Sequence, residues 1–217
     1  MSGCDQVVFI VDDDKSLCDS ITDLLASVGI NALSFGSVAE FTAFKRPDLP
    51  ACLLLDIELP GISGLEFQRR AAQAAHPPIV FVTGHGDIPS TVRAIKSGAI
   101  DFLTKPFAEQ ALLDAVHNAI AIDRKARHDS AQLDQLRGRL ATLTPRELEV
   151  LPLVVSGLLN KQAAQELGIS EVTLQIHRGK IMRKMAAASL ADLVRISERL
   201  NIKIKHSRRA GQTNEDT

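Results

Sequence analysis

Five polar residues in the first half of the chain, Asp12, Asp13, Asp56, Thr83 and Lys105, have the types needed to receive a phosphoryl group on a carboxylate. Three carboxylates at one point repel one another, and Mg²⁺, which prefers oxygen ligands, would relieve that repulsion. A lysine and a hydroxyl can neutralise the oxygens of the transferring group while one aspartate acts as the nucleophile. This chemistry requires all five side chains at one place, so the fold has to bring them together.

Short apolar runs end at or just before each of these residues. Five such runs cover residues 7–11, 31–35, 52–55, 79–83 and 100–104, and their length and flanking turn residues are typical of buried strands. Segments with helical periodicity separate them, which predicts a doubly wound α/β domain with a five-stranded parallel sheet. Ligands bind at the carboxyl ends of such strands, so the polar residues that follow the strands should converge there.

Asp56 is the residue on which this prediction depends most. A lone aspartate is more often a helix cap or a loop acid. Here an unbroken run, residues 52–55, leads into it, and Pro60, Gly61 and Gly64 behind it force a loop. A rigid strand would therefore present the carboxylate beside a loop, and Asp56 is the predicted nucleophile.

The composition describes a globular protein. The chain has 217 residues, enough for one large or two ordinary domains, with 45% hydrophobic and 24% charged residues. No apolar run has membrane-spanning length, and the N-terminus lacks the pattern of a secretory signal. Cys4, Cys18 and Cys52 are unspaced for metal binding and suit reduced thiols, two of them buried. We therefore expect a cytoplasmic protein without a membrane partner.

Charge is distributed unevenly along the chain. Residues 141–217 hold 12 of the 25 Lys and Arg but only 8 of the 26 Asp and Glu, which leaves 13 basic and 18 acidic residues in residues 1–140. An acidic first part and a basic second part indicate different partners, and the basic part is the candidate for binding a polyanion.

Residues 108–140 contain no Pro, and Gly first occurs at Gly138. Their apolar residues recur mostly at steps of three and four, at Leu112, Val116, Ala119, Ile122, Ala126, Leu133, Leu136 and Leu140. This stripe fits one long amphipathic helix, with a possible bend at residues 128–130. The alternative is a last helix of the first domain followed by a solvated linker. Whether the linker, residues 126–141, also forms a dimer is open.

The second domain reads as a set of short helices. Helix starts are predicted at four capping residues, Thr144, Asn160, Ser170 and Ser189. Thr144 is followed by Pro and, three residues later, by Glu147, as in a capping box. Pro152 should kink the first helix or remove one hydrogen bond. A short turn with Gly168 separates the second and third helices, which is the spacing of a helix-turn-helix.

The predicted helix 171–185 has a polar side and an apolar side. Leu174, Ile181 and Met185 face inward, and the polar side carries Thr173, Gln175, His177, Arg178, Lys180, Arg183 and Lys184. Such a helix fits the major groove of DNA. The alternative is an ordinary solvated face, which is common for basic helices outside a helix-turn-helix.

Residues 5–125 resemble the receiver domain of two-component response regulators. The matching segments are Val11-Asp12-Asp13-Asp14, Leu55-Asp56-Ile57-Glu58-Leu59-Pro60-Gly61-Ile62-Ser63-Gly64, Val82-Thr83-Gly84-His85-Gly86 and Lys105-Pro106-Phe107. The resemblance implies that a sensor histidine kinase phosphorylates Asp56, and that Asp12 or Asp13, Asp56 and the Glu58 carbonyl hold Mg²⁺. It also implies that Thr83 and Phe102 form a switch pair and that the Lys105–Pro106 bond is cis.

Residues 142–200 resemble the LuxR-type DNA-binding domain. The matching segments are Leu143-Thr144-Pro145-Arg146-Glu147, Asn160-Lys161-Gln162-Ala163-Ala164 and Leu167-Gly168-Ile169-Ser170-Glu171-Val172-Thr173-Leu174-Gln175-Ile176-His177-Arg178. With the receiver, the chain is similar to the FixJ/NarL class, nearer FixJ. The resemblance implies that Gln175, Ile176 and Gly179 face the bases of promoter DNA. The implied phosphate contacts are Lys161, Thr173, His177, Arg178, Lys180 and Lys184.

FixJ resemblance also implies a homodimer on phosphorylation. The pairing surface would be the helix 88–97 with the strand 100–104, including Val92, Lys96 and Asp101. RNA polymerase is a further expected partner. The predicted divisions are a receiver at 1–125, a linker at 126–141, a DNA-binding domain at 142–204 and a disordered tail at 205–217.

The leading hypothesis is a phosphorylation-controlled transcription factor, with no enzymatic activity beyond loss of its own phosphoryl group. A phosphatase of the haloacid dehalogenase type is a second hypothesis, but that class expects an aspartate where this chain has Glu58. A third is a phospho-relay protein whose basic domain binds another protein.

Overall fold

The computed structural model describes residues 5–71, 76–84 and 98–203, and the chain divides into two compact units, residues 1–128 and 129–217. No described helix has the length and apolar character needed to cross a membrane. The helix predicted at 88–97, with Val92 and Lys96, and the tail predicted at 205–217 lie outside the described residues.

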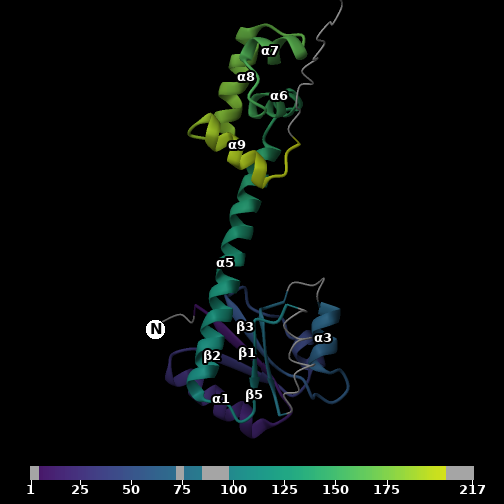
Figure 1. Ribbon diagram of the computed structural model, residues 1–217, viewed down its shortest axis with the longest axis vertical. Helices are drawn as coiled ribbons and strands as arrows, with labels where there is room; N and C mark the ends of the chain where they lie inside the picture. The colour runs from purple at the N-terminus through teal and green to yellow at the C-terminus, as the bar shows by residue number, and fades with distance from the viewer. Residues whose placement is uncertain (1–4, 72–75, 85–97, 204–217) are drawn as a thin grey trace, which may run out of the picture. The chain divides into compact units, whose positions relative to one another are not determined.

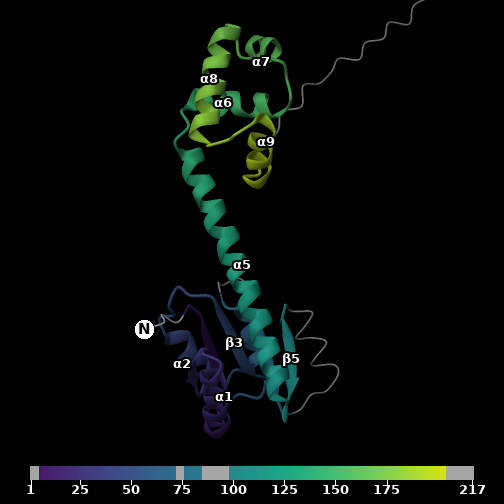
Figure 2. The same ribbon diagram turned by 90° about the vertical axis from the view of Figure 1, so that its left-hand side faces the viewer.

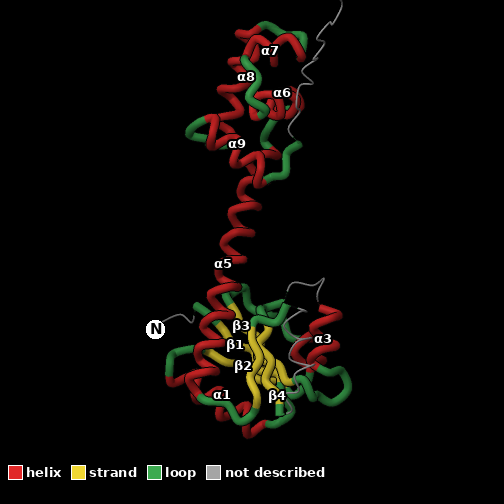
Figure 3. Tube along the Cα trace, in the orientation of Figure 1, coloured by secondary structure: helices red, strands yellow, loops and turns green. Residues whose placement is uncertain are grey.

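The first unit is built on a five-stranded parallel sheet, drawn in yellow in Figure 3. Its strands are β1 (Val7–Val11), β2 (Asn31–Phe35), β3 (Ala51–Asp56), β4 (Ile79–Thr83) and β5 (Asp101–Thr104). They lie in the order β2-β1-β3-β4-β5, with every neighbouring pair parallel. The predicted fold class is confirmed, and the strand bounds differ from the predicted runs by at most one residue at either end.

Helices cover both faces of this sheet (Figures 1 and 2). On one face α1 (Lys15–Ser27) and the first part of α5 (Glu109–Ala141) pack on alternate strand residues such as Ile10, Leu54 and Val80. On the other face, α2 (Val38–Ala43) and α3 (Gly64–Ala71) pack on the intervening residues, such as Phe9 and Leu55. Because both faces are covered, β1, β3 and β4 are buried along their whole length, which explains their unbroken apolar sequences.

Helix α5 is continuous over residues 109–141, as the apolar stripe predicts, and it runs from the first unit into the second. The part of α5 in the first unit is held to the sheet by Asp123, which accepts the backbone N–H of Ala51 at 2.8 Å and the Nε–H of Arg127 at 2.7 Å. Arg127 also pairs with Asp48. A buried carboxylate with both partners holds α5 against the start of β3.

The second unit contains the end of α5 and four further helices: α6 (Pro145–Val155), α7 (Asn160–Glu166), α8 (Glu171–Lys184) and α9 (Leu190–Arg199). Thr144 caps α6 and Glu147 completes the predicted capping box. Leu174, Ile181 and Met185 of α8 and its C-cap are fully buried, as predicted. Leu136 of α5 joins the same core, so the end of the predicted linker packs as part of this unit.

One local prediction for these helices is wrong. Asn160 was expected to cap α7 but is its first residue, and Leu159 holds the N-cap position. The side chain of Gln162 accepts the Leu159 N–H at 3.0 Å, while the Asn160 side chain contacts α8. Pro152 lies inside α6, which continues to Val155, in keeping with the predicted loss of one helical N–H.

Candidate functional site

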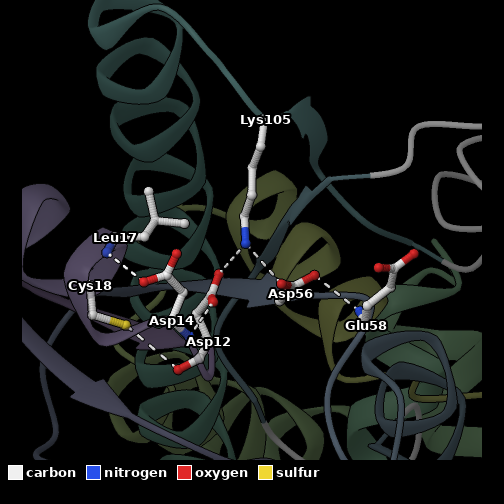
Figure 4. A network of polar contacts seen from close by, with 7 residues as sticks. All are labelled: Asp12, Asp14, Leu17, Cys18, Asp56, Glu58 and Lys105. Atoms are coloured by element: carbon white, nitrogen blue, oxygen red, sulfur yellow. Dashed lines mark hydrogen bonds and ion pairs between the residues drawn. The ribbon is translucent and has the colours of Figure 1, made fainter.

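Strand register brings the predicted acidic residues together. Val11 of β1 lies opposite Leu55 of β3, so Asp12 and Asp56 emerge side by side at the carboxyl ends of two neighbouring strands. The ammonium of Lys105, just after β5, lies between them, 2.6 Å from Asp12 Oδ2 and 2.8 Å from Asp56 Oδ2 (Figure 4). Both carboxylates are buried, at 4% and 6% exposure, so the lysine is held on charges that water reaches poorly.

Asp13 completes a cluster of three carboxylates with Asp12 and Asp56, whose ligand atoms lie within 4.8 Å of one another. Asp13 itself is exposed. Hard carboxylate oxygens, of which only those of Asp13 are open to solvent, suit Mg²⁺, which can keep part of its water shell on the exposed side. The donor set therefore fits this ion. The Glu58 N–H donates to Asp56 Oδ1 at 3.0 Å, which orients the Asp56 carboxylate from the loop side (Figure 4).

The pKa values of Asp12 and Lys105 are set by two opposing effects, burial and their mutual attraction. Burial raises the pKa of Asp12, and the hydrogen bond from Lys105 only partly opposes this. Burial lowers the pKa of Lys105, but its hydrogen bonds to Asp12 and Asp56 outweigh burial, so the pKa of Lys105 is raised overall. The lysine therefore stays cationic at the place where a phosphoryl group on Asp56 would carry its negative oxygens.

The loop after Asp56 is shaped by two glycines. Gly61 has φ +88°, a conformation that favours glycine. Gly64 starts α3, and a Cβ there would lie 2.3 Å from the Asp56 backbone oxygen. Only glycine lets α3 approach the end of β3 this closely, so Gly64 fixes the loop that flanks Asp56.

The predicted switch residues occupy neighbouring strands. Thr83 ends β4 and is fully buried, and its backbone oxygen accepts the Lys105 N–H at 2.8 Å. Phe102 pairs in register with Phe81, and its partly buried side chain packs on the same side of the sheet as that of Phe81. Asp101, from the predicted dimer face, accepts the Phe102 N–H at 2.8 Å. The Lys105–Pro106 bond is cis, as predicted.

Cys18 and Cys52 are buried free thiols, as predicted; Cys4 lies outside the described residues. Burial raises the pKa of Cys18 to about 11 and raises that of Cys52 further. The Cys18 thiol donates to the Asp12 backbone oxygen at 3.6 Å, so it lies beneath the acidic cluster. Both thiols are protonated packing groups.

The predicted DNA-contacting residues divide into two sets. Gln175, Ile176, Gly179 and Lys180 of α8, and Lys161 of α7, are exposed, whereas Thr173, His177, Arg178 and Lys184 are half-buried. The hydroxyl of Thr173 is 2.8 Å from that of the N-cap residue Ser170. His177 Nδ1 is buried without a hydrogen-bond partner among the described residues. The exposed residues of α8 in this set lie on the side of the helix away from its buried stripe.

Two cations of α8 have internal partners that the sequence pattern did not reveal. Arg178 donates to Asn160 Oδ1 at 3.0 Å, tying α8 to α7. Lys184 donates to Glu147 Oε2 at 2.7 Å and to the Thr142 backbone oxygen at 2.9 Å. Glu147 is only 2% exposed, and its pKa is lowered to about 2 by the hydrogen bond from Lys184 and then by that from the Thr144 N–H. The signal for this pair was the position of Lys184, three residues after buried Ile181.

Family models match both units. Residues 8–117 match the response regulator receiver domain, and residues 141–203 match the LuxR family of bacterial regulatory proteins. The chain belongs to the response regulator family. Its DNA-binding half makes it a transcriptional response regulator of a two-component system rather than a member of an enzyme family.

Individual relatives support this assignment, and their similarity extends over most of both chains. Nodulation protein W of Bradyrhizobium diazoefficiens is 51% identical over 93% of this chain and 89% of that protein. The transcriptional regulatory protein FixJ of Azorhizobium caulinodans is 39% identical over 88% of this chain and 90% of that protein. The solved structure of the response regulator StyR matches with a TM-score of 0.80 and 46% identity, covering 90% of this chain and 99% of that one.

Proposed function

We propose that Asp56 receives a phosphoryl group from the phosphohistidine of a sensor kinase and that this modification controls binding of α8 to promoter DNA. The observation that supports this most is the Lys105 ammonium held between Asp12 and Asp56. An oxygen of Asp56 forms the new bond to phosphorus, the bond from phosphorus to the kinase histidine breaks, and an acyl phosphate results.

Asp12, Asp13 and Asp56, with the Glu58 carbonyl, are the residues we propose to hold Mg²⁺, whose charge would offset that of the phosphoryl oxygens. Lys105 is already oriented toward Asp56 and supplies a second positive charge. Burial of Asp12 and Asp56 limits access of competing water to the reacting carboxylate.

Phosphorylation adds a charge of about −2 at Asp56. We propose that Thr83 turns toward the new oxygens and that Phe102 moves inward on the same side of the sheet. A surface that includes Val92, Lys96 and Asp101 would then pair two copies of the chain. A homodimer would match two DNA half-sites about one helical turn apart.

For DNA we propose Gln175, Ile176 and Gly179 as base-facing residues, because all three are exposed on the side of α8 away from its core. Lys161 and Lys180 are the best placed phosphate contacts, since both are exposed. The proposed set is completed by Thr173, His177, Arg178 and Lys184. The guanidinium of Arg178 and the ammonium of Lys184 also bind partners within the domain. Recruitment of RNA polymerase and action in the cytoplasm follow for a promoter-bound regulator, and we propose no enzymatic activity beyond loss of the phosphoryl group.

The test is to incubate the full-length protein with acetyl phosphate, with and without Mg²⁺, and to map the label by mass spectrometry after trapping the acyl phosphate. We expect one label, at Asp56, only with Mg²⁺. Asp13→Asn, which removes an exposed ligand, should raise the Mg²⁺ concentration needed for labelling, whereas Asp56→Asn should remove the label. A label retained in Asp56→Asn would refute the assignment, and turnover of a generic phosphomonoester would favour the phosphatase.

A further inference from the structure

A cavity lies in the first unit on the face of the sheet that α2 and α3 cover. Its volume is about 320 Å³, and its apolar walls are formed by Val38, Phe41, Ile62, Phe67 and Ala71. Cavities of a few hundred Å³ with mostly apolar walls and a few polar groups are typical of small-molecule sites. None of these residues belongs to the acidic cluster around the phospho-acceptor, so the cavity is a separate feature of the first unit.

Aromatic rings form a large part of the cavity wall. Phe41 and Phe67 are 2% and 8% exposed, and their ring centroids lie 6.0 Å apart at 80°, which is an edge-to-face arrangement. His76 adds a third ring, whose centroid is 6.4 Å from that of Phe67. A further aromatic ring can join such a group in the same favoured geometry, which a saturated ring cannot do. The wall therefore favours a ligand with a flat aromatic body.

Two arginines bring positive charge to the cavity. The guanidinium carbon of Arg46 lies 5.4 Å from the centroid of the Phe41 ring, so this charge is held beside the aromatic wall. Arg70 donates to Glu66 at 2.6 Å, but a guanidinium has five N–H donors, so this ion pair leaves donors for a second carboxylate. Among the described residues that line the cavity, none is acidic. The charge distribution therefore favours an anionic ligand.

We propose that this cavity binds an aromatic carboxylic acid. The ring of the acid lies against Phe41 and Phe67, and its carboxylate accepts hydrogen bonds from Arg46 and Arg70. A neutral apolar molecule would make no use of the two positive charges, and an inorganic anion would leave the aromatic wall uncovered. An aromatic carboxylate matches both parts of the site.

One wall of the cavity belongs to the loop that follows Asp56. Ile62 lies in this loop, between Glu58 and Gly64. The Glu58 N–H donates to Asp56 Oδ1 at 3.0 Å, and Gly64 lies against the Asp56 backbone oxygen. A ligand packed on Ile62 therefore contacts the loop that orients the Asp56 carboxylate. We expect occupancy of the cavity and modification of Asp56 to be linked, so that each changes the affinity for the other by the same factor.

Binding of the acid does not depend on phosphorylation, so it is tested first, on the unmodified full-length protein. The probe is 1-naphthoate, titrated by calorimetry and located by methyl NMR. We expect a dissociation constant of about 1 mM or lower. The methyl signals of Val38 and Ile62 should shift, whereas those of Val28, exposed at the end of α1, should not. Absence of binding, or shifts confined to residues outside the cavity, would overturn the site.

Ligand analogues test the two parts of the proposed chemistry. The neutral 1-naphthamide should bind about tenfold more weakly than 1-naphthoate, because it lacks the charge that the arginines pair with. Benzoate should bind about threefold more tightly than cyclohexanecarboxylate, because only benzoate can stack on the aromatic wall. Inorganic phosphate should not displace 1-naphthoate. Equal binding within either pair of analogues, or displacement by phosphate, would refute the ligand class.

Matched variants test the arginines. Arg46→Gln and Arg70→Gln should each weaken binding of 1-naphthoate by about threefold, a modest effect because both side chains are partly open to water. Lys45→Gln and Arg69→Gln, each next to one of these arginines but outside the cavity lining, should bind like wild type. Equal losses in all four variants would show that binding follows net charge and would refute the contacts. If the Arg46 and Arg70 variants lose self-association in sedimentation but keep full 1-naphthoate binding, the cavity is an interface between two copies of the chain, which also refutes the proposal.

The last step measures the linkage, which rests on the proposed modification of Asp56. The titration is repeated in Mg²⁺ and beryllium fluoride, and ¹⁹F NMR of the same samples shows whether the fluoride complex is bound. The affinity of wild type for 1-naphthoate should change by about fivefold, at the low end of typical couplings, and that of Asp56→Asn should stay constant. No bound beryllium fluoride in wild type would contradict the proposed function. Bound beryllium fluoride with an unchanged affinity would instead refute the linkage.

Discussion

The receiver site and helix α8 place their functional groups in opposite ways. In the receiver, Asp12 and Asp56 are 4% and 6% exposed, and their oxygens are already engaged by Lys105 and by backbone N–H groups. On α8, Val172 and Ile176 are 67% and 54% exposed, opposite a fully buried stripe. The receiver groups are bound to one another, whereas the α8 groups point away from the protein.

This difference separates reactivity from recognition. In the receiver the chemistry depends on the mutual positions of a few charges, so removing one group affects all of them. In the second unit, internal pairs such as Glu147–Lys184 fix the helix, and the exposed side chains can vary without changing the fold. Substitutions should therefore be severe in the receiver and graded on α8, and the experiments below test that contrast.

The largest effect is expected at Lys105. Lys105→Met leaves two buried carboxylates facing each other and removes a positive charge from the phosphoryl oxygens. Phosphorylation by acetyl phosphate should slow by about 100-fold or more. Rates are measured by mass spectrometry, with Lys45→Met, at an exposed lysine, as control. Equal rates for both variants would show that the receiver site tolerates loss of its cation.

The next largest effect is expected from loss of the Glu147–Lys184 ion pair inside the second unit. Glu147→Ala leaves Lys184 and the Thr144 N–H without their carboxylate, and should lower the free energy of unfolding of the second unit by about 2–4 kcal/mol. Glu149→Ala, which breaks an exposed pair with Arg146 on the same helix, should cost at most about 0.5 kcal/mol. Urea unfolding followed by circular dichroism measures both. A similar small loss for the two variants would mean that the Lys184 pair does not support the domain.

Smaller effects are expected for side chains that face DNA. Gln175→Ala should cost about 1–3 kcal/mol on the cognate duplex and relax the preference at one base pair. Lys180→Ala should weaken cognate and scrambled duplexes alike and reduce the salt slope by about one unit. Titrations at several salt concentrations distinguish them. If Gln175→Ala weakens both duplexes equally, Gln175 contacts the DNA backbone and the assignment of base-facing residues is wrong.

The last expected effect is a pH dependence of the stability that Glu147 provides. The pKa of Glu147 is about 2 in the folded chain and near the ordinary 4.5 when unfolded, so the unfolded chain binds more protons between these values. The stabilisation by Glu147 is therefore complete above pH 4.5 and falls as pH is lowered toward 2. Urea midpoints of wild type and Glu147→Gln should differ most at pH 5 and converge at lower pH. A gap that stays constant with pH would contradict the ionic role of Glu147.

Strands and the acidic site could be predicted because local patterns determine them. Asp56 and Lys105 follow apolar strands, and parallel strands end at one edge, so their convergence follows from topology alone. The contacts of long side chains on helices are harder to predict, because a sequence pattern gives the side of the helix on which a residue lies but not the residue that it will bind. Lys184 was assigned only to phosphate, yet its position beside the buried stripe lets it reach Glu147.

The exposed side of α8 was only partly predicted for a related reason. Val172 lies two residues after the N-cap Ser170, and helical spacing from the inward-facing Leu174 and Ile181 places it on the exposed side, although its apolar side chain alone gives no reason to expect exposure. Its 67% exposure appears only once Leu174 and Ile181 define the buried side. Asp123 is similar, because its partner Ala51 is 72 residues away in sequence.

The central claim is that phosphorylation of Asp56 controls DNA binding by α8. Its most direct test is the affinity of full-length protein for a duplex selected from a random library, by fluorescence anisotropy in Mg²⁺, with and without beryllium fluoride. Wild type should bind about tenfold or more tightly with beryllium fluoride, as expected for a typical coupling of 1–3 kcal/mol, and Asp56→Asn should not respond. Equal affinities of wild type in both conditions, or a response retained by Asp56→Asn, would contradict the account.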